Sequence, residues 1–170
     1  GPPKKKPVNV HELLEYVVRI IEAEDPKKLK IRRDYDPGLP EIDLDRDQMV
    51  QALLNLMINS IEQMALIAEL LDGKRIHADT ELWVHTPRAI RQVADRSGYT
   101  AIIEAAGGVV MSDTCPSISR KVPAGTRVIA TDSAKQAHYL PAIAKVQGWF
   151  GSVEQCVSSA IAGEWLGVVQ

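Results

Sequence analysis

A chain of 170 residues with 45% hydrophobic and 25% charged residues has the composition of a soluble globular protein, with room for one domain or two small ones. Its formal net charge of −2 gives no argument for a nucleic-acid partner, and we expect none. Two cysteines are too few for a disulfide framework, which favours a reducing, cytoplasmic location. No apolar run approaches the roughly 20 residues of a membrane-spanning helix, so we expect no membrane partner.

The first seventy residues predict a helix, a strand pair and a second, long helix. Asn9 is a typical helix cap, and apolar residues at helical spacing follow it to about Ala23. Alternation over residues 29–35 predicts a half-buried strand. Asp45 predicts the cap of the long helix, whose wide apolar stripe continues without a breaker to Leu71.

After residue 73, short apolar runs alternate with helical patterns. Strands are expected at residues 82–84, 109–111, 127–130 and 144–147. Helices are expected from Pro87 after a Thr86 cap, at 101–106, from a Ser133 cap to a halt at Pro141, and from a Ser152 cap to Gly163. This alternation predicts an α/β fold: a three-layer sandwich with a mostly parallel sheet, onto which the N-terminal helix–strand pair–helix part packs.

The best candidate site lies in the stretch GGVVMSDTCP, residues 107–116. A glycine pair ends a helix, an apolar run makes a strand, and the strand ends in Asp113, Thr114 and Cys115. Chemistry in parallel α/β sheets sits at the carboxyl ends of strands, which is where this carboxylate, hydroxyl and thiol are expected. A structural interpretation stays open, in which Asp113 anchors a loop or caps a helix and the cysteines are ordinary buried thiols.

The stretch QALLNLMINSIEQM, residues 51–64, resembles the N-box helix of sensor histidine kinases of the nitrogen-regulation type. The resemblance covers about residues 7–64. It implies an ATP-binding-domain fragment in which Asn55 and Asn59 bind the magnesium and phosphates of ATP. Amide oxygens are suitable magnesium ligands. The family's glycine-rich boxes, D-x-G-x-G and G-x-G-x-G, do not follow in this sequence, so a complete adenine pocket is not expected.

A second resemblance covers about residues 70–166. The motifs D-T-C, then T-x-S-x-K-x-A-x-Y-x-P, then F-G-S-x-x-x-C-V, occur in the order seen in the large subunit of aconitase X. Members of that family are hydro-lyases of small hydroxy acids. The resemblance implies that Cys115 and Cys156 help hold an iron–sulfur or iron centre, with Ser133 and Lys135 near the substrate. Asp113 is the remaining catalytic candidate. The family's usual asparagine is replaced by Asp132.

An iron–sulfur cluster takes roughly four ligands, and two cysteines are too few. We therefore expect no bound cofactor; the alternatives to this expectation are iron, an iron–sulfur cluster or Mg-ATP. Gly1-Pro2 resembles the remnant of a cleaved tag. We therefore interpret the chain as an engineered or recombined chimera without an intact active site, not an enzyme in its own right. The expected parts are 1–6 (tag remnant and basic tail), 7–71 (kinase-like) and 72–170 (aconitase X-like), sharing one fused core. A residual hydro-lyase site, residual nucleotide binding and a homodimer are the alternatives.

Overall fold

The computed structural model describes residues 2–24, 31 and 33–168. The chain divides into two compact units: the N-terminal unit, residues 1–62, and the C-terminal unit, residues 63–170. The division falls inside the long helix α2 (Arg46–Leu71), earlier than the boundary expected after residue 71. The one fused core that the sequence analysis expects is tested by unfolding experiments.

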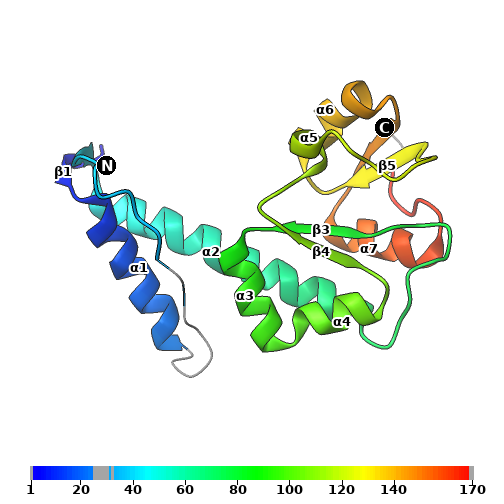
Figure 1. The fold of residues 1–170 in the computed structure, drawn as a ribbon, viewed down its shortest axis with the longest axis horizontal. Coiled ribbons are helices and arrows are strands. Elements are labelled where there is room, and N and C mark those ends of the chain that lie inside the picture. Colours follow the sequence, from blue (N-terminus) through cyan, green and yellow to red (C-terminus); the bar gives the residue numbers. More distant parts are fainter. Residues whose placement is uncertain (1, 25–30, 32, 169–170) are drawn as a thin grey trace. The chain divides into compact units, whose positions relative to one another are not determined.

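The N-terminal unit contains an antiparallel strand pair and two helices (Figure 1). Strand β1 (Lys6–Val8) pairs with β2 (Ile42–Leu44), and helix α1 (Val10–Glu24) lies between them in the sequence. Both predicted caps are confirmed. Asn9 Oδ1 accepts hydrogen bonds from the backbone N–H of His11 at 2.9 Å and of Glu12 at 3.3 Å. Asp45 Oδ1 accepts one from Gln48 N–H at 3.2 Å, at the start of α2.

The core of the N-terminal unit forms where one face of α1 meets one face of α2. Leu13, Val17 and Ile21 of α1 are buried together with Val50 of α2. The partly buried side chains around them are Val8, Ile31, Leu44, Leu53, Leu54 and Met57. Burial of these apolar side chains is the main stabilising contribution that this small unit can draw on.

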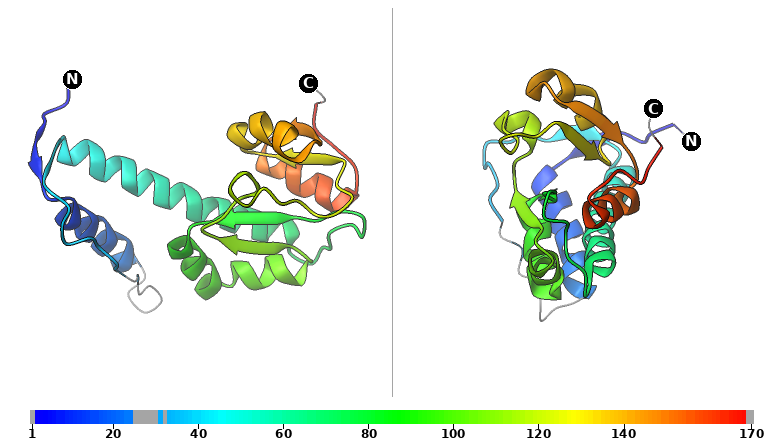
Figure 2. Two further views of the ribbon diagram at one scale, coloured as in Figure 1. Left: turned by 45° about the horizontal axis from the view of Figure 1, so that its top comes forward. Right: turned by 90° about the vertical axis from the view of Figure 1, so that its right-hand side faces the viewer.

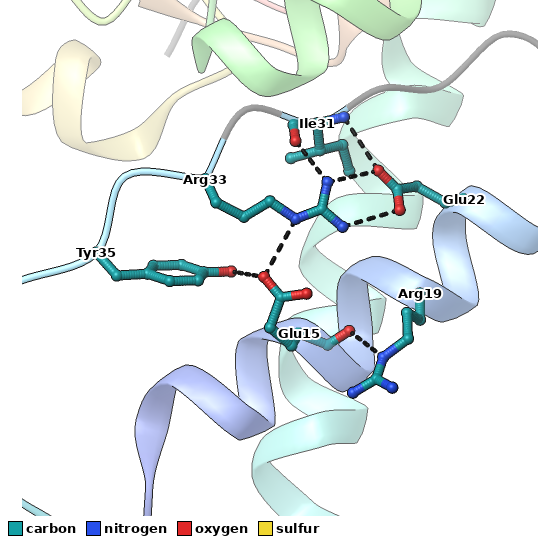
Figure 3. A network of polar contacts seen from close by, with 6 residues as sticks. All are labelled: Glu15, Arg19, Glu22, Ile31, Arg33 and Tyr35. Carbon is teal, nitrogen blue, oxygen red and sulfur yellow. Dashed lines mark hydrogen bonds and ion pairs between the residues drawn. The ribbon is translucent and has the colours of Figure 1, made fainter. Parts of the chain in front are cut away.

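Residues 31 and 33–35 do not form the strand that alternation predicted, and residues 29, 30 and 32 lie outside the described residues. Side-chain contacts hold this segment to α1 instead (Figure 3). Arg33 donates from Nη1 and Nη2 to the two carboxylate oxygens of Glu22, at 2.8 and 2.9 Å. Its Nε donates to Glu15 at 3.1 Å, and the Tyr35 hydroxyl donates to the same Glu15 oxygen at 2.9 Å. Alternating polarity arises here because a charged residue faces a helix rather than because strands pair.

The described part of the C-terminal unit contains two parallel strand pairs, one with two helices between its strands in the sequence and the other with one (Figure 2). Its elements are β3 (Trp83–Thr86), α3 (Arg88–Ser97), α4 (Tyr99–Ala105), β4 (Val109–Ser112), α5 (Pro116–Ser119), β5 (Val128–Thr131), α6 (Ala134–Ala144), β6 (Gln147–Phe150) and α7 (Val153–Ala162). Strand β3 pairs with β4, and β5 pairs with β6. Helices α3 and α4 pack against β4, and α6 packs against both β5 and β6.

The α/β class is confirmed, but in the part of the chain that the structure describes the strands form three two-stranded sheets rather than one mostly parallel sheet. Helices and strands alternate in the same way in one four-stranded sheet and in two separate β–α–β units. Periodicity reports which side of a strand is buried, and it carries no information about which strand edges pair. The expected single sheet therefore went beyond what the pattern could establish.

The core of the C-terminal unit is formed by the end of α2, by helices α3, α4, α6 and α7, and by strands β3 and β4. Its buried apolar residues are Met64, Ile67, Ala68, Leu71, Val84, Ile90, Val93, Ala94, Ile103, Ala106, Val110, Leu140, Val157 and Ala160. Arg91 connects three elements through ion pairs and a hydrogen bond. It pairs with Asp95 and with Glu104 at 3.1 and 3.0 Å, and donates to the Val110 carbonyl.

The sequence predicted that Pro141 ends α6, but the helix continues to Ala144. A proline removes one helical hydrogen bond, and Pro141 lies close to the end of the helix, in its last turn. A Cβ atom on Gly148 of β6 would lie 2.8 Å from Pro141 Cγ and 3.3 Å from the Ala137 carbonyl. The shift of the last strand from 144–147 to Gln147–Phe150 follows from this longer helix.

By length and composition alone, α2 is long and apolar enough to cross a membrane, which the sequence analysis did not anticipate. Only 11% of its most apolar stretch is buried. A core helix of a soluble protein passes the same test of length and composition, so this property is weak support for membrane insertion.

Glu22→Gln should destabilise α1, because it removes the negative charge of the carboxylate to which Arg33 donates. The Tyr35 hydroxyl and Arg33 hold the pKa of Glu15 below its ordinary value of 4.5, and Arg33 does the same for the pKa of Glu22. A lowered folded pKa means that this stabilisation is present above about pH 4.5 and is lost as pH falls further. Hydrogen exchange of the α1 amides at pH 7 should be faster in Glu22→Gln than in Glu12→Gln. Equal exchange in both variants would show that the network does not hold α1.

Gly148→Ala should destabilise the C-terminal unit by about 1–3 kcal/mol, because the added methyl group overlaps a proline ring that cannot move away. Denaturant unfolding followed by tryptophan fluorescence measures this, since Trp83, Trp149 and Trp165 all lie in that unit. Gly38→Ala lies in the N-terminal unit, where its nearest neighbour is the Asp36 side chain at 3.3 Å, so it should leave this tryptophan-detected midpoint unchanged. An unchanged midpoint for Gly148→Ala would contradict the close packing.

Candidate functional site

The carboxyl ends of β5 and β6 meet beside an open cavity of about 610 Å³ within the C-terminal unit. Asp132 follows β5 directly, and Gly151 and Ser152 follow β6. The cavity is lined by Gln63, Leu66, Asp132, Phe150, Gly151, Ser152, Val153, Glu154, Gln155 and Val168. This is the position at which ligands bind in parallel α/β folds.

Ser152 fixes the far side of this cavity through a capping box. Its hydroxyl accepts the Gln155 backbone N–H at 3.2 Å, and Gln155 Oε1 accepts the Ser152 backbone N–H at 2.9 Å, as the sequence predicted. Ser133 caps α6 through a single bond, in which its hydroxyl accepts the Gln136 N–H at 3.4 Å. Ser133 and Lys135 follow Asp132 in the chain, but they are not among the residues that line the cavity.

Cys156 lies in the first turn of α7, where its N–H donates to the Ser152 carbonyl at 3.0 Å. Burial, and then the negative charge of Asp132, raise the pKa of Cys156 to about 11. The side chain is therefore a neutral thiol at physiological pH. A solvent-exposed cysteine in the first turn of a helix would instead have a lowered pKa and favour the thiolate.

Cys115 precedes α5 and has the opposite electrostatic environment. Burial acts to raise its pKa, but the backbone N–H groups of Ile118 and Ser117, the Gln136 side chain and the charge of Lys135 together lower the pKa below its ordinary value. Ser117 Oγ donates to Gln136 Oε1 at 2.6 Å, which links the Cys115 loop to α6. The pKa values of the two cysteines thus shift in opposite directions, which the sequence did not indicate.

Asp113 is engaged by Arg88. Its Oδ1 accepts the Arg88 backbone N–H at 2.9 Å, and its Oδ2 lies 3.0 Å from both Nε and Nη2 of Arg88. Asp113, with a positive φ of 55°, thereby supplies the side-chain cap of α3 from the end of β4. The predicted Thr86 cap is wrong: Thr86 is the buried last residue of β3, and Pro87 has no side-chain cap bond. This geometry is that of a loop anchor, and a catalytic role for Asp113 stays a prediction.

His85 is a residue that sequence reasoning missed. It lies on β3 opposite Met111 of β4, and among the described residues neither ring nitrogen has a partner at good hydrogen-bond geometry, only a weaker contact with the backbone of Thr114. Burial lowers the pKa of His85, partly opposed by the backbone of Thr114. A lone histidine within a short strand gives no pattern in the sequence, so only its burial could have identified it.

The donor set does not fit a complete metal centre. Among residues 2–24, 31 and 33–168, no group of three or more histidine, cysteine, aspartate or glutamate side chains is placed to hold a metal ion. An iron–sulfur cluster needs about four ligands, chiefly thiolates. Cys156 is a protonated thiol in this environment, so the pair Cys115 and Cys156 offers at most one ready ligand.

Asn55 and Asn59 are both exposed and lie one turn apart on α2, as expected for the N-box. Two amide oxygens are a small share of the roughly six oxygen ligands that magnesium takes. Nucleotide binding there stays a prediction.

Comparison with known proteins divides the chain in two. Residues 58–162 match the family model "Aconitase X third domain", a match that begins earlier than the expected residue 70. The phosphomevalonate dehydratase large subunit of Methanocaldococcus jannaschii is 45% identical over 96 residues, 56% of this chain and 23% of that protein. The cis-3-hydroxy-L-proline dehydratase of Pseudomonas aeruginosa is 33% identical over 106 residues, 61% of this chain and 18% of that protein.

A separate set of relatives consists of histidine kinases. The sensory histidine kinase/phosphatase NtrB of Vibrio alginolyticus is 46% identical over 61 residues, 36% of this chain and 17% of that protein. The chain thus spans about a quarter or less of the length of these curated relatives. Both predicted resemblances are confirmed. Since the match over residues 58–162 covers more than half of the sequence, the chain belongs to the family of the aconitase X third domain.

Proposed function

We propose that residues 58–162 are a hydro-lyase third domain that carries part of a substrate and metal site, and that the chain by itself does not dehydrate a hydroxy acid. The observation that carries this is the donor set: the described residues contain no group of three metal-binding side chains, whereas the relatives named as dehydratases are about four or more times longer than the matched part. The remaining ligands and substrate contacts would come from segments outside the match.

We further propose that the kinase-like part and the aconitase X-like part were joined by engineering or recombination. Similarity to two unrelated kinds of enzyme within one chain supports this. In this proposal the chain is a cytoplasmic chimera. Its first part contributes a helix and a small core rather than a catalytic site.

Anaerobic treatment with iron and sulfide tests the incomplete site. We expect a featureless visible spectrum and no iron retained after desalting, because Cys156 stays protonated and too few ligands converge. Stoichiometric iron with a charge-transfer band, lost in both Cys115→Ser and Cys156→Ser, would contradict the proposal. Loss of iron in neither variant would identify adventitious binding.

The two thiols should differ in reactivity, because the thiolate is the nucleophile. At pH 8, iodoacetamide should modify Cys115 at least about tenfold faster than Cys156, as expected when burial and Asp132 raise the pKa of the latter to about 11. The rate at Cys156 should still be rising at pH 10, while that at Cys115 has reached a plateau. Peptide mass spectrometry follows both sites in one sample. Equal rates throughout would contradict the assigned protonation states.

Residual Mg-nucleotide binding is the second candidate, and the similarity to NtrB together with the exposed Asn55 and Asn59 favours it. Any ligand that binds only the folded state raises the melting temperature. If the candidate is correct, saturating Mg-ADP should raise the melting temperature of the chain but not that of Asn55→Ala. If Mg-ADP does not shift the melting temperature of the chain, the nucleotide-binding candidate is wrong.

A further inference from the structure

A short segment after α7, residues 163–168, turns back toward β6 (Figure 2) and is called the strap below. It begins at Gly163, whose N–H donates to the Ser159 carbonyl at 2.9 Å. Further along, the Leu166 N–H donates to Oγ of the same buried serine at 2.9 Å. In the part of the chain that the structure describes, this is the one hydrogen bond that joins residues 164–168 to the elements before them.

The ring of Trp165 makes the main contact of the strap. It stacks on Trp149 of β6, with the ring centroids 5.7 Å apart and the planes 29° apart. It also takes the space that side chains would need at two glycines. A Cβ on Gly151 would lie 2.5 Å from Trp165 Cη2, and a Cβ on Gly167 would likewise overlap the ring. The two glycines therefore leave a slot for the indole, and Trp165 is the latch of the strap.

The strap borders the cavity at the carboxyl ends of β5 and β6. Val168 of the strap lines this cavity together with Gly151 and Gln155. The Trp165 ring lies beside the same two residues, because Gln155 Oε1 is 2.8 Å from the Cβ position of Gly151 that the ring also approaches. Movement of the strap would thus change one side of the cavity without any movement of β5 or β6.

Few contacts besides the latch hold the strap closed. The side chains of Leu166 and Val168 are 52% and 75% exposed, so they contribute little apolar burial. The indole N–H groups of Trp149 and Trp165 are buried, and among the described residues neither has a hydrogen-bond partner. A buried donor without a partner costs free energy, and hydration of the group removes that cost. Opening of the strap is favoured to that extent.

We propose that the strap opens as a unit while the rest of the C-terminal unit stays folded, and that opening exposes the Gly151 side of the cavity. The motion is confined to the residues after Gly163, because the point at which the strap leaves α7 is fixed. The His77 N–H donates to the Ala160 carbonyl at 2.9 Å, and a Cβ on Gly163 would lie 2.6 Å from the His77 ring. This opening controls access to the cavity whether or not the chain retains a metal site.

Hydrogen exchange measured by NMR tests the opening, because the indole N–H protons report it directly. The indole protons of Trp149 and Trp165 and the Leu166 amide should exchange through one shared opening, at least about 100-fold faster than the Val157 amide of α7. Low concentrations of denaturant should accelerate exchange at Val157 alone. The indole of Trp83, which donates to an exposed carboxylate, is the internal reference for a ring outside the strap.

A pair of serine variants tests the anchor of the strap. Ser159→Ala removes the hydrogen bond to Leu166 and should accelerate exchange at both indoles about three- to tenfold, as expected for the loss of one hydrogen bond. Ser158→Ala is the matched control, since it alters the neighbouring serine of α7 and leaves that hydrogen bond in place. Circular dichroism should show that both variants fold. Equal exchange in the two variants would contradict the assigned anchor.

Release of the latch tests the link between the strap and the cavity. In Trp165→Ala, the neutral nitroxide TEMPOL should broaden the amide resonances of Gly151 and Gln155 more than it does in the parent chain. The amide of Val110, buried in β4, is the control and should be unaffected in both chains.

Three results would overturn the proposal. Exchange of both indoles at the rate and with the denaturant dependence of Val157 would show that the strap moves only when the whole unit unfolds. Exchange at the rate of Trp83 would show that no closed strap forms. Equal broadening by TEMPOL in Trp165→Ala and in the parent chain would show that the strap does not limit access to the cavity. The first two results do not depend on the folding of any variant.

Discussion

Helix α2 is the element on which both units depend, because its two ends contribute to two different cores. Val50, near its start, is buried with Leu13, Val17 and Ile21 of α1. Leu71, at its end, is 1% exposed within the C-terminal unit. Neither unit could bury its apolar faces without this helix, since the other elements of each are short. The match to the aconitase X third domain begins at residue 58, within α2, and the division between the two units falls in the same helix.

Local chemistry explains which elements the sequence could predict. Asn9, Asp45 and Ser152 cap helices wherever they precede an apolar stripe, because the hydrogen bond involves residues two or three positions away. The alternation over residues 29–35 misled the prediction because Ile31, Arg33 and Tyr35 all contact α1, at positions up to 20 residues away in the chain, and do not pair with a strand. Pairing between strand edges is likewise non-local, which is why two separate parallel pairs looked like one sheet.

The candidate site shows the same division between what is local and what is not. The sequence correctly placed Cys115 after a strand and Cys156 near the start of a helix, yet it did not predict α5 and could not give the pKa shifts of the two thiols. Asp132 and the burial of α7 raise the pKa of one thiol, and Gln136 with two backbone N–H groups lowers that of the other. Asp113 was correctly predicted to lie at the end of a strand, but its partner Arg88 is brought to it only by the pairing of β3 with β4.

The central claim is that two units with separate cores share a single helix. Equilibrium unfolding in denaturant tests it most directly, with tryptophan fluorescence and far-UV circular dichroism recorded on one sample. All three tryptophans lie in the C-terminal unit, whereas circular dichroism reports helices in both. We predict that the transitions do not coincide and that circular dichroism shows an additional phase from α1 and the first half of α2. Coincident single transitions would contradict the account and show one cooperative core, as in other two-state domains.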